Sequence, residues 1–483
     1  MSAEVQYIIV LTIYLLGILL WGLYQGKKVK NQSDYSIASR NLPGWVAALS
    51  ERSAGESSWA LLGLPGYAYA VGISSIWTAV GCVLGIITAW WLLAWRLRDE
   101  AEKYKAETYT DYLAKRFGKN SNLLKIIASS VIVFFFFFYV GAQFLGGGKT
   151  FFTLFKIKPE FGMIIIAAII IPYAVYGGFK SVVYADVVQS IIMITILIVT
   201  PIIGIIVLSS ESAVYTNSIV EALRKSGNNF TSIIGDTTNG IWNGTIIGGL
   251  SWFFGYLGGQ PQLSIRFMAI KNKKNAILAR NIGIIWTLLA YAGALIIGWL
   301  GLAFFGPNGL DDSEQVMPTL LIHLFPPFIA AILITGIIAA ILSTADSLLI
   351  VSATELSESL VKPYLSKGKL SQLAISRLIT IIIAALALIA VFSAPTNLIY
   401  NLVGYVWAGI GGTFSVIILF SLFWKKFHSI SAIITIIIGI SFTIIWISSG
   451  MEEIVTSRIL TFFVAAITAI LTTILIKQKN DDK

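Results

Sequence analysis

The chain has 483 residues, of which 57% are hydrophobic and only 12% are charged. A soluble domain carries about 25% charged residues, so this composition excludes an ordinary soluble globular protein. The formal net charge is +10, but Lys and Arg gather in short segments between apolar runs, which indicates membrane loops rather than nucleic-acid binding. The one cysteine, Cys82, excludes a disulfide framework, and His323 and His428 lie too far apart for a metal-ligand spacing.

Long apolar runs recur along the whole chain, and their length is about the 20 residues that cross a bilayer core of about 30 Å. The pattern predicts an all-α polytopic membrane protein with about 13 transmembrane helices. The first run lacks the basic region and cleavage site of a signal peptide, so we expect an uncleaved first span. In chain order, the predicted spans are 5–25, 42–70, 72–97, 123–152, 161–178, 184–209, 240–262, 281–306, 326–355, 374–393, 396–424, 429–449 and 458–477.

Basic residues predict how the spans are oriented. Most of the 34 Lys and Arg residues follow odd-numbered spans, as in the KKVK segment at 27–30 and the KNKK segment at 271–274. By the positive-inside rule, the N-terminus lies outside and the C-terminus is cytoplasmic. The predicted location is therefore the plasma (inner) membrane. Because the segments between spans are short, we expect residues 1–483 to form a single transmembrane domain.

Two predicted spans contain helix-breaking residues. The second reads GESSWALLGLPG over residues 55–66, and the seventh reads GGLSWFFGYLGGQPQ over residues 248–262. A broken helix at membrane depth leaves backbone groups unpaired, which is tolerated where they line a cavity or bind a ligand. Breaks at matching positions of two halves indicate the binding site of a transporter. Close helix packing is the alternative explanation for glycines in membrane helices, and we prefer it for most of the 42 glycines.

The two breaks divide the chain into repeated halves. Spans 2–6 and 7–11 form two sets of five, and each set begins with a broken span. Because five is an odd number, the second set enters the membrane from the opposite side, which predicts an inverted repeat. The predicted organisation is a leading helix and loop (1–41), a first repeat (42–209), a second repeat (240–424) and two C-terminal helices (425–483).

Ionisable residues inside membrane spans are candidates for function, because charge is costly in the bilayer core. Arg266 follows the seventh span directly, and we expect it to reach cytoplasmic water and to be structural. The candidates within or at the edge of predicted spans are Glu51, Arg52, Glu56, Asp186 and Asp346.

The ninth span concentrates oxygen atoms in its sequence GIIAAILSTADSLLIVSATE. Ser343, Thr344, Asp346 and Ser347 fall on one or two helical turns. A lone Ser or Thr in a helix can bond the carbonyl four residues back, but four polar residues in five positions are explained less well in this way. Hard cations bind several oxygen ligands. The cluster and the bared carbonyls of a broken helix together predict a sodium site.

The charges of the second span have three possible roles. Arg52 and Glu56 are four residues apart and share one helix face, so they can form a buried pair that latches the broken helix. Alternatively, Arg52 binds a substrate carboxylate in a two-point contact. In a third role, Glu56 attracts Na⁺ or titrates as a proton-coupling acid.

The sequence resembles the sodium:solute symporters, most closely the bacterial sodium/proline symporter branch. The resemblance covers nearly the whole chain. It implies a five-plus-five inverted repeat, the leucine-transporter-like fold, with one extra N-terminal and two extra C-terminal helices. The resemblance rests on five segments: SRNLPGWVAALS at 39–50, TYTDYLAKRF at 108–117, YGGFKSVVYADVVQ at 176–189, FGYLGGQPQLSIRFMA at 254–269 and AAILSTADSLLIVSA at 339–353.

The resemblance also implies site residues. The Na⁺ ligands would be the backbone carbonyls of Ser53, Glu56 and Ala340 and the hydroxyls of Ser343 and Thr344. A second ion site or ion exit would include Asp186, Asp346 and Ser347. The substrate pocket would include Ser57, Ser58, Tyr139, Trp252, Tyr256 and Pro261. Candidate gating or latch residues are Arg40, Glu51 and Arg52.

The second span departs from the proline branch. That branch has an aspartate where this chain has Gly55, and an apolar residue where it has Glu56. The acid has therefore moved one position along the chain, while Glu51 and Arg52 replace small residues. These changes are compatible with ion binding and leave the choice of substrate open.

The predicted function is sodium-coupled symport, by alternating access, that imports a small organic solute, namely proline or a related amino acid. The alternatives are a sodium- or proton-coupled symporter for another small carboxylate-bearing solute, and a transporter-like solute sensor. We do not expect an enzyme, because no nucleophile–base pair, metal cluster or cofactor loop is present in the sequence. The expected partners are the solute, Na⁺ as coupling ion and the lipid bilayer, without nucleic acid, and we expect a functional monomer.

Overall fold

The computed structural model describes residues 1–27, 29, 32–37, 40–118, 121–210, 214–235, 245–361, 371–392 and 397–476, and these residues are almost entirely helical. The first eleven α-helices are α1 (Ala3–Gly26), α2 (Gln32–Ile37), α3 (Gly44–Ser58), α4 (Leu64–Val71), α5 (Ile76–Thr88), α6 (Ala94–Lys103), α7 (Tyr109–Phe117), α8 (Ser121–Phe155), α9 (Pro159–Ser210), α10 (Ile219–Lys225) and α11 (Asn228–Thr231). The others are α12 (Thr245–Leu250), α13 (Trp252–Gly255), α14 (Pro261–Met268), α15 (Lys273–Phe305), α16 (Val316–Leu324), α17 (Pro327–Leu356), α18 (Gln372–Val391), α19 (Ile399–Val406), α20 (Thr413–Phe423), α21 (Ser429–Ser448) and α22 (Ser457–Leu475).

Short π- and 3-10-helical turns connect several of these helices. The π-helical turns are η2 (Trp59–Gly63), η4 (Ala89–Leu93), η6 (Ser357–Val361) and η8 (Trp407–Gly412), and the 3-10 turns are η3 (Gly72–Ser75), η5 (Ser313–Gln315) and η9 (Met451–Glu453).

Ten helical stretches among the described residues are long and apolar enough to cross a membrane. Two of them, at 44–103 and 159–210, each cover two predicted spans, because only a short turn or kink separates the halves. In α9 this kink lies at Gly178, whose φ is +65°. The predicted seventh span, 240–262, contains the short helices α12 and α13 and the first two residues of α14 instead of one long helix. The number of thirteen spans stays a prediction, and the predicted spans 240–262, 374–393, 396–424 and 458–477 each begin or end at residues outside the described ranges.

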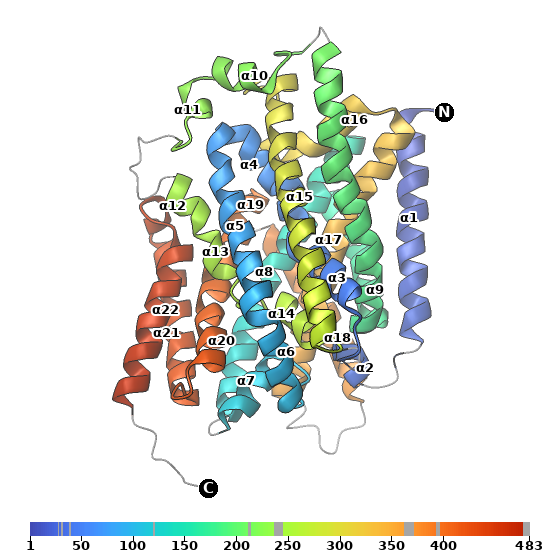
Figure 1. Cartoon of the computed structure of the whole chain (residues 1–483). Helices are drawn as coiled ribbons and strands as arrows, with labels where there is room; N and C mark the ends of the chain where they lie inside the picture. The colour runs from blue at the N-terminus through green and yellow to red at the C-terminus, as the bar shows by residue number, and fades with distance from the viewer. Residues whose placement is uncertain are drawn as a thin grey trace.

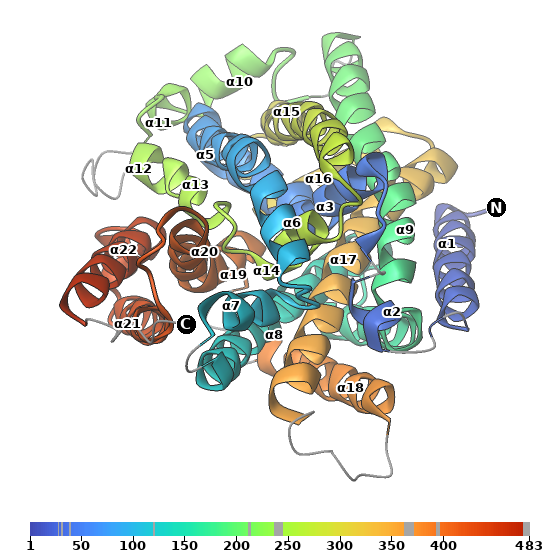
Figure 2. The same ribbon diagram turned by 60° about the horizontal axis from the view of Figure 1, so that its bottom comes forward.

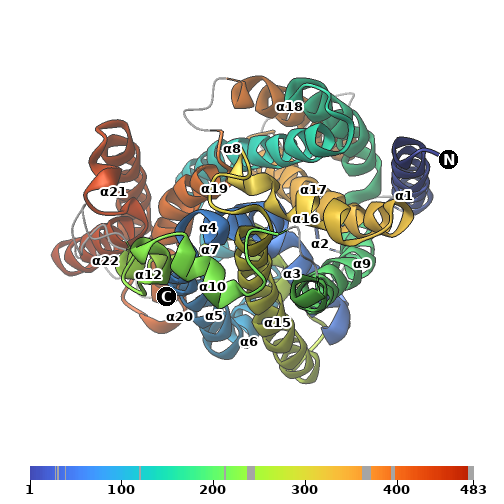
Figure 3. The same ribbon diagram turned by 90° about the horizontal axis from the view of Figure 1, so that it is seen from above.

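The long helices form one bundle, and α1 begins at the end of the bundle opposite to the end where α22 stops (Figure 1). Helices α3, α14 and α17 lie in the interior, while α1, α18, α21 and α22 lie at the periphery (Figures 2 and 3). The leading helix α1 packs on α9 and α17, and the two C-terminal helices α21 and α22 pack on each other. The first broken helix, α3, contacts α9, α15 and α17, so the break lies in the core of the bundle.

Glycines at the second break are required for both conformation and packing. Gly258 has a φ of +84°, which L side chains rarely adopt. A Cβ atom added at Gly259 would lie 2.1 Å from the carbonyl oxygen of Gly411, so no other residue fits there without movement of the backbone. The glycines of the 248–262 segment therefore allow a non-helical turn and a close approach of η8.

Candidate functional site

The first break is confirmed at Ser57, which has φ +58° and ψ −170° within α3. Ser58 N–H, whose helical backbone partner the break removes, donates to Gln143 Oε1 at 3.0 Å. Trp59 N–H donates to Ser57 Oγ at 3.0 Å and to the carbonyl of Glu56. In a regular helix, Ser58 N–H would bond the carbonyl of Ala54. That carbonyl instead accepts the hydroxyl of Thr344 at 3.2 Å. The break therefore turns a backbone carbonyl of α3 towards α17.

The candidate sodium ligands lie on the two sides of this contact. Ser53 and Glu56 belong to α3, whereas Ala340, Ser343 and Thr344 belong to α17, and all five are fully buried. Ser343 Oγ donates to Asp186 Oδ1 at 2.5 Å, so a carboxylate borders the cluster. Hydroxyl, carbonyl and carboxylate oxygens are the ligand types that Na⁺ and other hard cations prefer. The donor set therefore fits a sodium ion, and the assignment of individual ligands stays a prediction.

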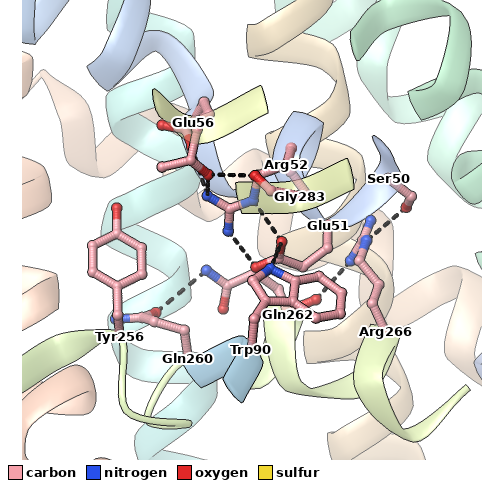
Figure 4. Close-up of polar contacts among 12 residues, drawn as sticks. Ser50, Glu51, Arg52, Glu56, Trp90, Tyr256, Gln260, Gln262, Arg266 and Gly283 are labelled. Carbon is pink, nitrogen blue, oxygen red and sulfur yellow. Dashed lines mark hydrogen bonds and ion pairs between the residues drawn. The ribbon is translucent and has the colours of Figure 1, made fainter. Parts of the chain in front are cut away.

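Arg266 lies inside the bundle, so the expectation that it reaches cytoplasmic water is wrong. Its side chain is fully buried, and Nη2 forms a 2.8 Å ion pair with Asp186 Oδ2. Its Nε donates to Ser50 Oγ at 2.7 Å (Figure 4). Its Nη2 donates to Ser347 Oγ at 2.7 Å. Helix α14 directs the side chain towards α9 and α17, where the carboxylate of Asp186 compensates its charge.

The candidate second ion site surrounds this ion pair. Asp186 and Asp346 are fully buried, and Ser347 is 2% exposed. Asp346 Oδ1 accepts a 3.4 Å hydrogen bond from Ser347 Oγ, whereas its Oδ2 has no hydrogen-bond partner in the described part of the chain. Buried carboxylate oxygens require a partner. The structure therefore brings together the three residues of the predicted second site around Arg266.

Glu51, Arg52 and Glu56 form a buried triad on the side of α3 that faces α15 (Figure 4). The guanidinium bonds both carboxylates: Nε lies 2.6 Å from Glu51 Oε2, and Nη1 lies 2.8 Å from Glu56 Oε1. Nη1 also donates to Thr287 Oγ1 at 3.2 Å, and Trp90 Nε1 donates to Glu51 Oε2 at 3.2 Å. The pair between Arg52 and Glu56 that the sequence suggests is therefore present, and Glu51 extends it.

Three predicted pocket residues belong to a cluster of aromatic rings that we call the aromatic box. Tyr139 and Tyr256 pack on Trp407, with ring centroids 5.7 and 5.3 Å apart. Trp252 lies 6.0 Å from Trp407 and 4.5 Å from Trp59. The aromatic box consists of Trp59, Tyr139, Trp252, Tyr256, Tyr291, Tyr400 and Trp407.

Sequence reasoning missed four rings of the aromatic box. Trp59 follows the break by two residues, and Trp407 begins the glycine-rich segment WAGIGG. These positions could have predicted both rings, since an aromatic residue next to a helix break lies close to the site that the break forms. Tyr291 and Tyr400 give no such signal, because each lies in an ordinary apolar run.

The remaining candidates occupy different places. Ser57 and Ser58 lie at the break itself, and Pro261 begins α14 and is buried. Arg40 Nη1 donates to the carbonyl of Ala101 at 2.7 Å, so its contact is with the end of α6 and not with the triad. The structure therefore separates Arg40 from Glu51 and Arg52, with which the sequence groups it.

A cavity of about 390 Å³ is lined by residues of α19 and of the start of α22. Tyr400 lines the cavity and also belongs to the aromatic box, so the two share a wall. Arg458 of α22 lines it as well and lies 4.8 Å from the ring of Trp252. This cavity is the structural candidate for an access path to the aromatic box.

Comparisons with known proteins agree with this architecture. The sequence profile of the sodium:solute symporter family matches residues 35–439. The osmoregulated proline transporter OpuE of Bacillus subtilis is 33% identical over 455 residues, which cover 93% of this chain and 90% of that protein. The sodium/proline symporter of Salmonella typhimurium is 34% identical over 459 residues, which cover 93% of this chain and 89% of that protein.

Two solved structures have a similar fold. A Na⁺-coupled sialic acid symporter in a substrate-bound outward-open state matches with a TM-score of 0.79 and 19% identity, and the match covers 98% of both chains. MHP1, a nucleobase-cation-symport-1 family transporter in a closed conformation, matches with a TM-score of 0.55 and 12% identity over 92% of this chain and 96% of that one. At these identities the likeness shows the fold alone.

The fold and the family match define a multi-pass, sodium-coupled secondary transporter and not an enzyme. The chain belongs to the sodium:solute symporter family. The predictions of the family, of the leucine-transporter-like fold and of Na⁺ as the coupling ion are therefore confirmed.

Proposed function

We propose that this protein imports proline or a closely related amino acid together with Na⁺, by alternating access. The proposal rests on two contacts of the α3 break. On one side the break contacts a hydroxyl of α17, and on the other side it contacts the aromatic box. An aromatic box packs an apolar ring, while the groups bared by a broken helix bind ions and charged ends. Relatives named as proline transporters support the choice of solute.

The proposed sodium site lies between α3 and α17. Its ligands are the carbonyls of Ser53, Glu56 and Ala340 and the hydroxyls of Ser343 and Thr344. A sodium ion bound there contacts both helices at the break, so it stabilises the shape of the break and prepares the neighbouring solute pocket. Asp186, Asp346 and Ser347 form the proposed second ion site or the inner exit of the ion.

The proposed solute site lies in the aromatic box. Ser57, Ser58, Tyr139, Trp252, Tyr256 and Pro261 line it, and we add Trp59 and Trp407 on the basis of their ring contacts. The triad of Glu51, Arg52 and Glu56 latches the inner part of α3 to α15. Both carboxylates already engage Arg52, which favours the latch over direct binding of a solute carboxylate by the guanidinium.

We further propose that the protein acts as a monomer in the lipid bilayer of the plasma (inner) membrane. In the proposed orientation the N-terminus is outside and the C-terminus is cytoplasmic, as the distribution of Lys and Arg predicts. The cavity beside α19 and α22 then opens towards the outside, on the side from which the solute arrives.

Uptake by proteoliposomes tests the proposed function. The purified protein is offered a panel of labelled amino acids and small organic acids, with and without an inward sodium gradient. We expect accumulation of proline that requires the sodium gradient. If Na⁺ instead drives the accumulation of a carboxylic acid without an amino group, and no amino acid accumulates, the result would support the alternative of another small carboxylate-bearing solute.

A further inference from the structure

Seven buried polar atoms at the aromatic box and the α3 break have no hydrogen-bond partner among the described residues. Buried polar groups are normally paired, so these atoms are available to bond a group that the protein itself does not supply. The atoms are Glu56 Oε2, Ser58 Oγ, Trp59 Nε1, Tyr139 OH, Gln143 Nε2, Gln260 Nε2 and Trp407 Nε1.

The chemistry of these atoms divides them into two kinds. An indole N–H and an amide NH₂ can only donate a hydrogen bond, so Trp59, Trp407, Gln143 and Gln260 need an acceptor. An ionised carboxylate oxygen can only accept, so Glu56 Oε2 needs a donor. A ligand that satisfies both kinds offers acceptors to the N–H groups and a donor to the carboxylate, and an amino-acid zwitterion does both through its carboxylate and its ammonium group.

Charge balance points to a cation at Glu56. The triad contains two carboxylates and one guanidinium, and Arg52 is the one cation in ion-pair contact with either carboxylate in the described ranges. Both oxygens of Glu51 are bonded, by Arg52 and by Trp90. The excess negative charge of the triad therefore falls on Glu56, which is fully buried and whose Oε2 has no cationic partner among the described residues; the hydroxyl of Tyr291 beside it is a neutral donor.

Glu56 is close to the aromatic box. It directly precedes Ser57, the residue of the break, and Trp59 follows three positions later. Tyr256, a ring of the aromatic box, interacts electrostatically with Glu56, and its hydroxyl points towards the triad (Figure 4). The same hydroxyl lies 3.0 Å from that of Tyr291, which extends the polar edge of the aromatic box beside Glu56.

We propose that Glu56 binds the ammonium group of the amino-acid solute, while the N–H donors of the aromatic box, led by Trp59 and Trp407, bind its carboxylate. This inference rests on the proposed function and specifies the substrate class: a zwitterion whose nitrogen carries at least one hydrogen. Charge-assisted hydrogen bonds at both ends orient the solute, and the rings contact its apolar part. Glu56 thus gives the solute pocket a cation-binding end in addition to the proposed sodium site.

Competition for labelled proline uptake tests the inference with matched analogues. Cyclopentanecarboxylate keeps the ring and the carboxylate but lacks the nitrogen, and pyrrolidine keeps the nitrogen but lacks the carboxylate. For the wild type, we expect proline to compete about 10- to 100-fold better than cyclopentanecarboxylate, the range that a charge-assisted hydrogen bond supplies. In Glu56→Gln we expect this ratio to fall by about tenfold or more, because the carboxylate that distinguishes the two compounds is gone.

Glu51→Gln is the matched control, because it removes the same charge from the same triad but leaves Glu56 Oε2 in place. We expect a clearly smaller fall in the ratio than in Glu56→Gln, because the triad loses the same charge but keeps the oxygen that contacts the ammonium group. An equal weakening of proline and cyclopentanecarboxylate in Glu56→Gln would overturn the inference, since Glu56 would then support the helix and not the ammonium. A proton cotransported with proline and lost in Glu56→Gln, with an unchanged ratio, would also overturn it.

A second pair of variants tests the anionic end independently, including the case in which Glu56→Gln does not fold. Trp59→Phe and Trp407→Phe remove one N–H each, and we expect them to weaken proline and cyclopentanecarboxylate by equal factors and more than pyrrolidine, which has no carboxylate. Equal weakening of all three would overturn the assignment. The wild-type uptake experiment separates this inference from the proposed function. If an amino acid is taken up with Na⁺ but is not preferred over its nitrogen-free analogue, the proposed function stands and the inference about Glu56 fails.

Discussion

Arg266 of α14 and Asp186 of α9 form a fully buried ion pair with an Nη2–Oδ2 distance of 2.8 Å. The pair connects the second broken helix to the candidate sodium site, because Asp186 also accepts the hydroxyl of Ser343. Ser50 bonds both members of the pair from α3. One ion pair therefore joins α3, α9, α14 and α17 at one level of the bundle. When either broken helix moves, these contacts must break, or the contacting residues must move together with the helix.

Removal of Arg266 should destabilise the protein strongly. Arg266→Gln leaves Asp186 buried without its cation, and the loss of one partner of a buried pair costs about 3–5 kcal/mol. We expect a clearly lower Tm in detergent, and partial recovery in Arg266→Gln/Asp186→Asn, which leaves no charge in the pair. A single variant and a double variant that both melt like the wild type would contradict the importance of the pair.

Loss of the α17 hydroxyls should weaken sodium binding. In Ser343→Ala/Thr344→Ala, we expect the sodium concentration for half-maximal proline uptake to rise about tenfold or more, because the site loses two of its oxygen ligands. Ser352→Ala is the control, since this buried serine of α17 lies two turns further along the helix. Equal sodium dependence in the double variant and the wild type would show that the site lies elsewhere.

The triad gives a test that separates a latch from a solute-binding arginine. Arg52→Gln should lower Tm, because two carboxylates remain buried together. Glu51→Gln/Arg52→Gln removes one charge of each sign and keeps Glu56, so we expect it to recover part of the stability and sodium-driven proline uptake. Restored folding without any proline binding would instead assign the solute carboxylate to Arg52.

Asp111 predicts a pH dependence at the α7 end of the bundle. Burial alone would raise the pKa of Asp111, but hydrogen bonds from Lys115 and from the Glu107 backbone N–H, with Lys125 nearby, lower this pKa. A carboxyl whose folded-state pKa is lowered stabilises the fold above its unfolded pKa of about 3.9, and this contribution disappears as the pH falls through the folded-state pKa. Asp111→Asn should therefore lower Tm at neutral pH, and its difference from the wild type should vanish in acid. A Tm difference that is the same at pH 7 and in acid would contradict this assignment.

The sequence predicted the elements whose residues carry a distinctive pattern. Apolar runs and the Gly- and Pro-rich segments placed the helices and both breaks, and the ninth span showed its hydroxyl cluster directly. The position of Arg266 could not be predicted, because a residue just past an apolar run reaches water or turns inward according to tertiary contacts. Tyr291 and Tyr400 were missed for a related reason, since a tyrosine in an apolar run looks the same whether it faces lipid or a solute pocket, whereas the positions of Trp59 and Trp407 beside a break and a glycine-rich segment were a signal that the sequence did contain.

Coupling between the two fluxes tests the central claim most directly. Proteoliposomes contain equal sodium concentrations inside and outside, the membrane potential is held at zero, and an inward gradient of proline is imposed. If the protein is a sodium-coupled importer of proline, the proline gradient should drive labelled Na⁺ into the vesicles although Na⁺ itself has no gradient. Ser343→Ala/Thr344→Ala should strongly reduce this flux at the same sodium concentration. Entry of proline with no net movement of Na⁺ would contradict the account.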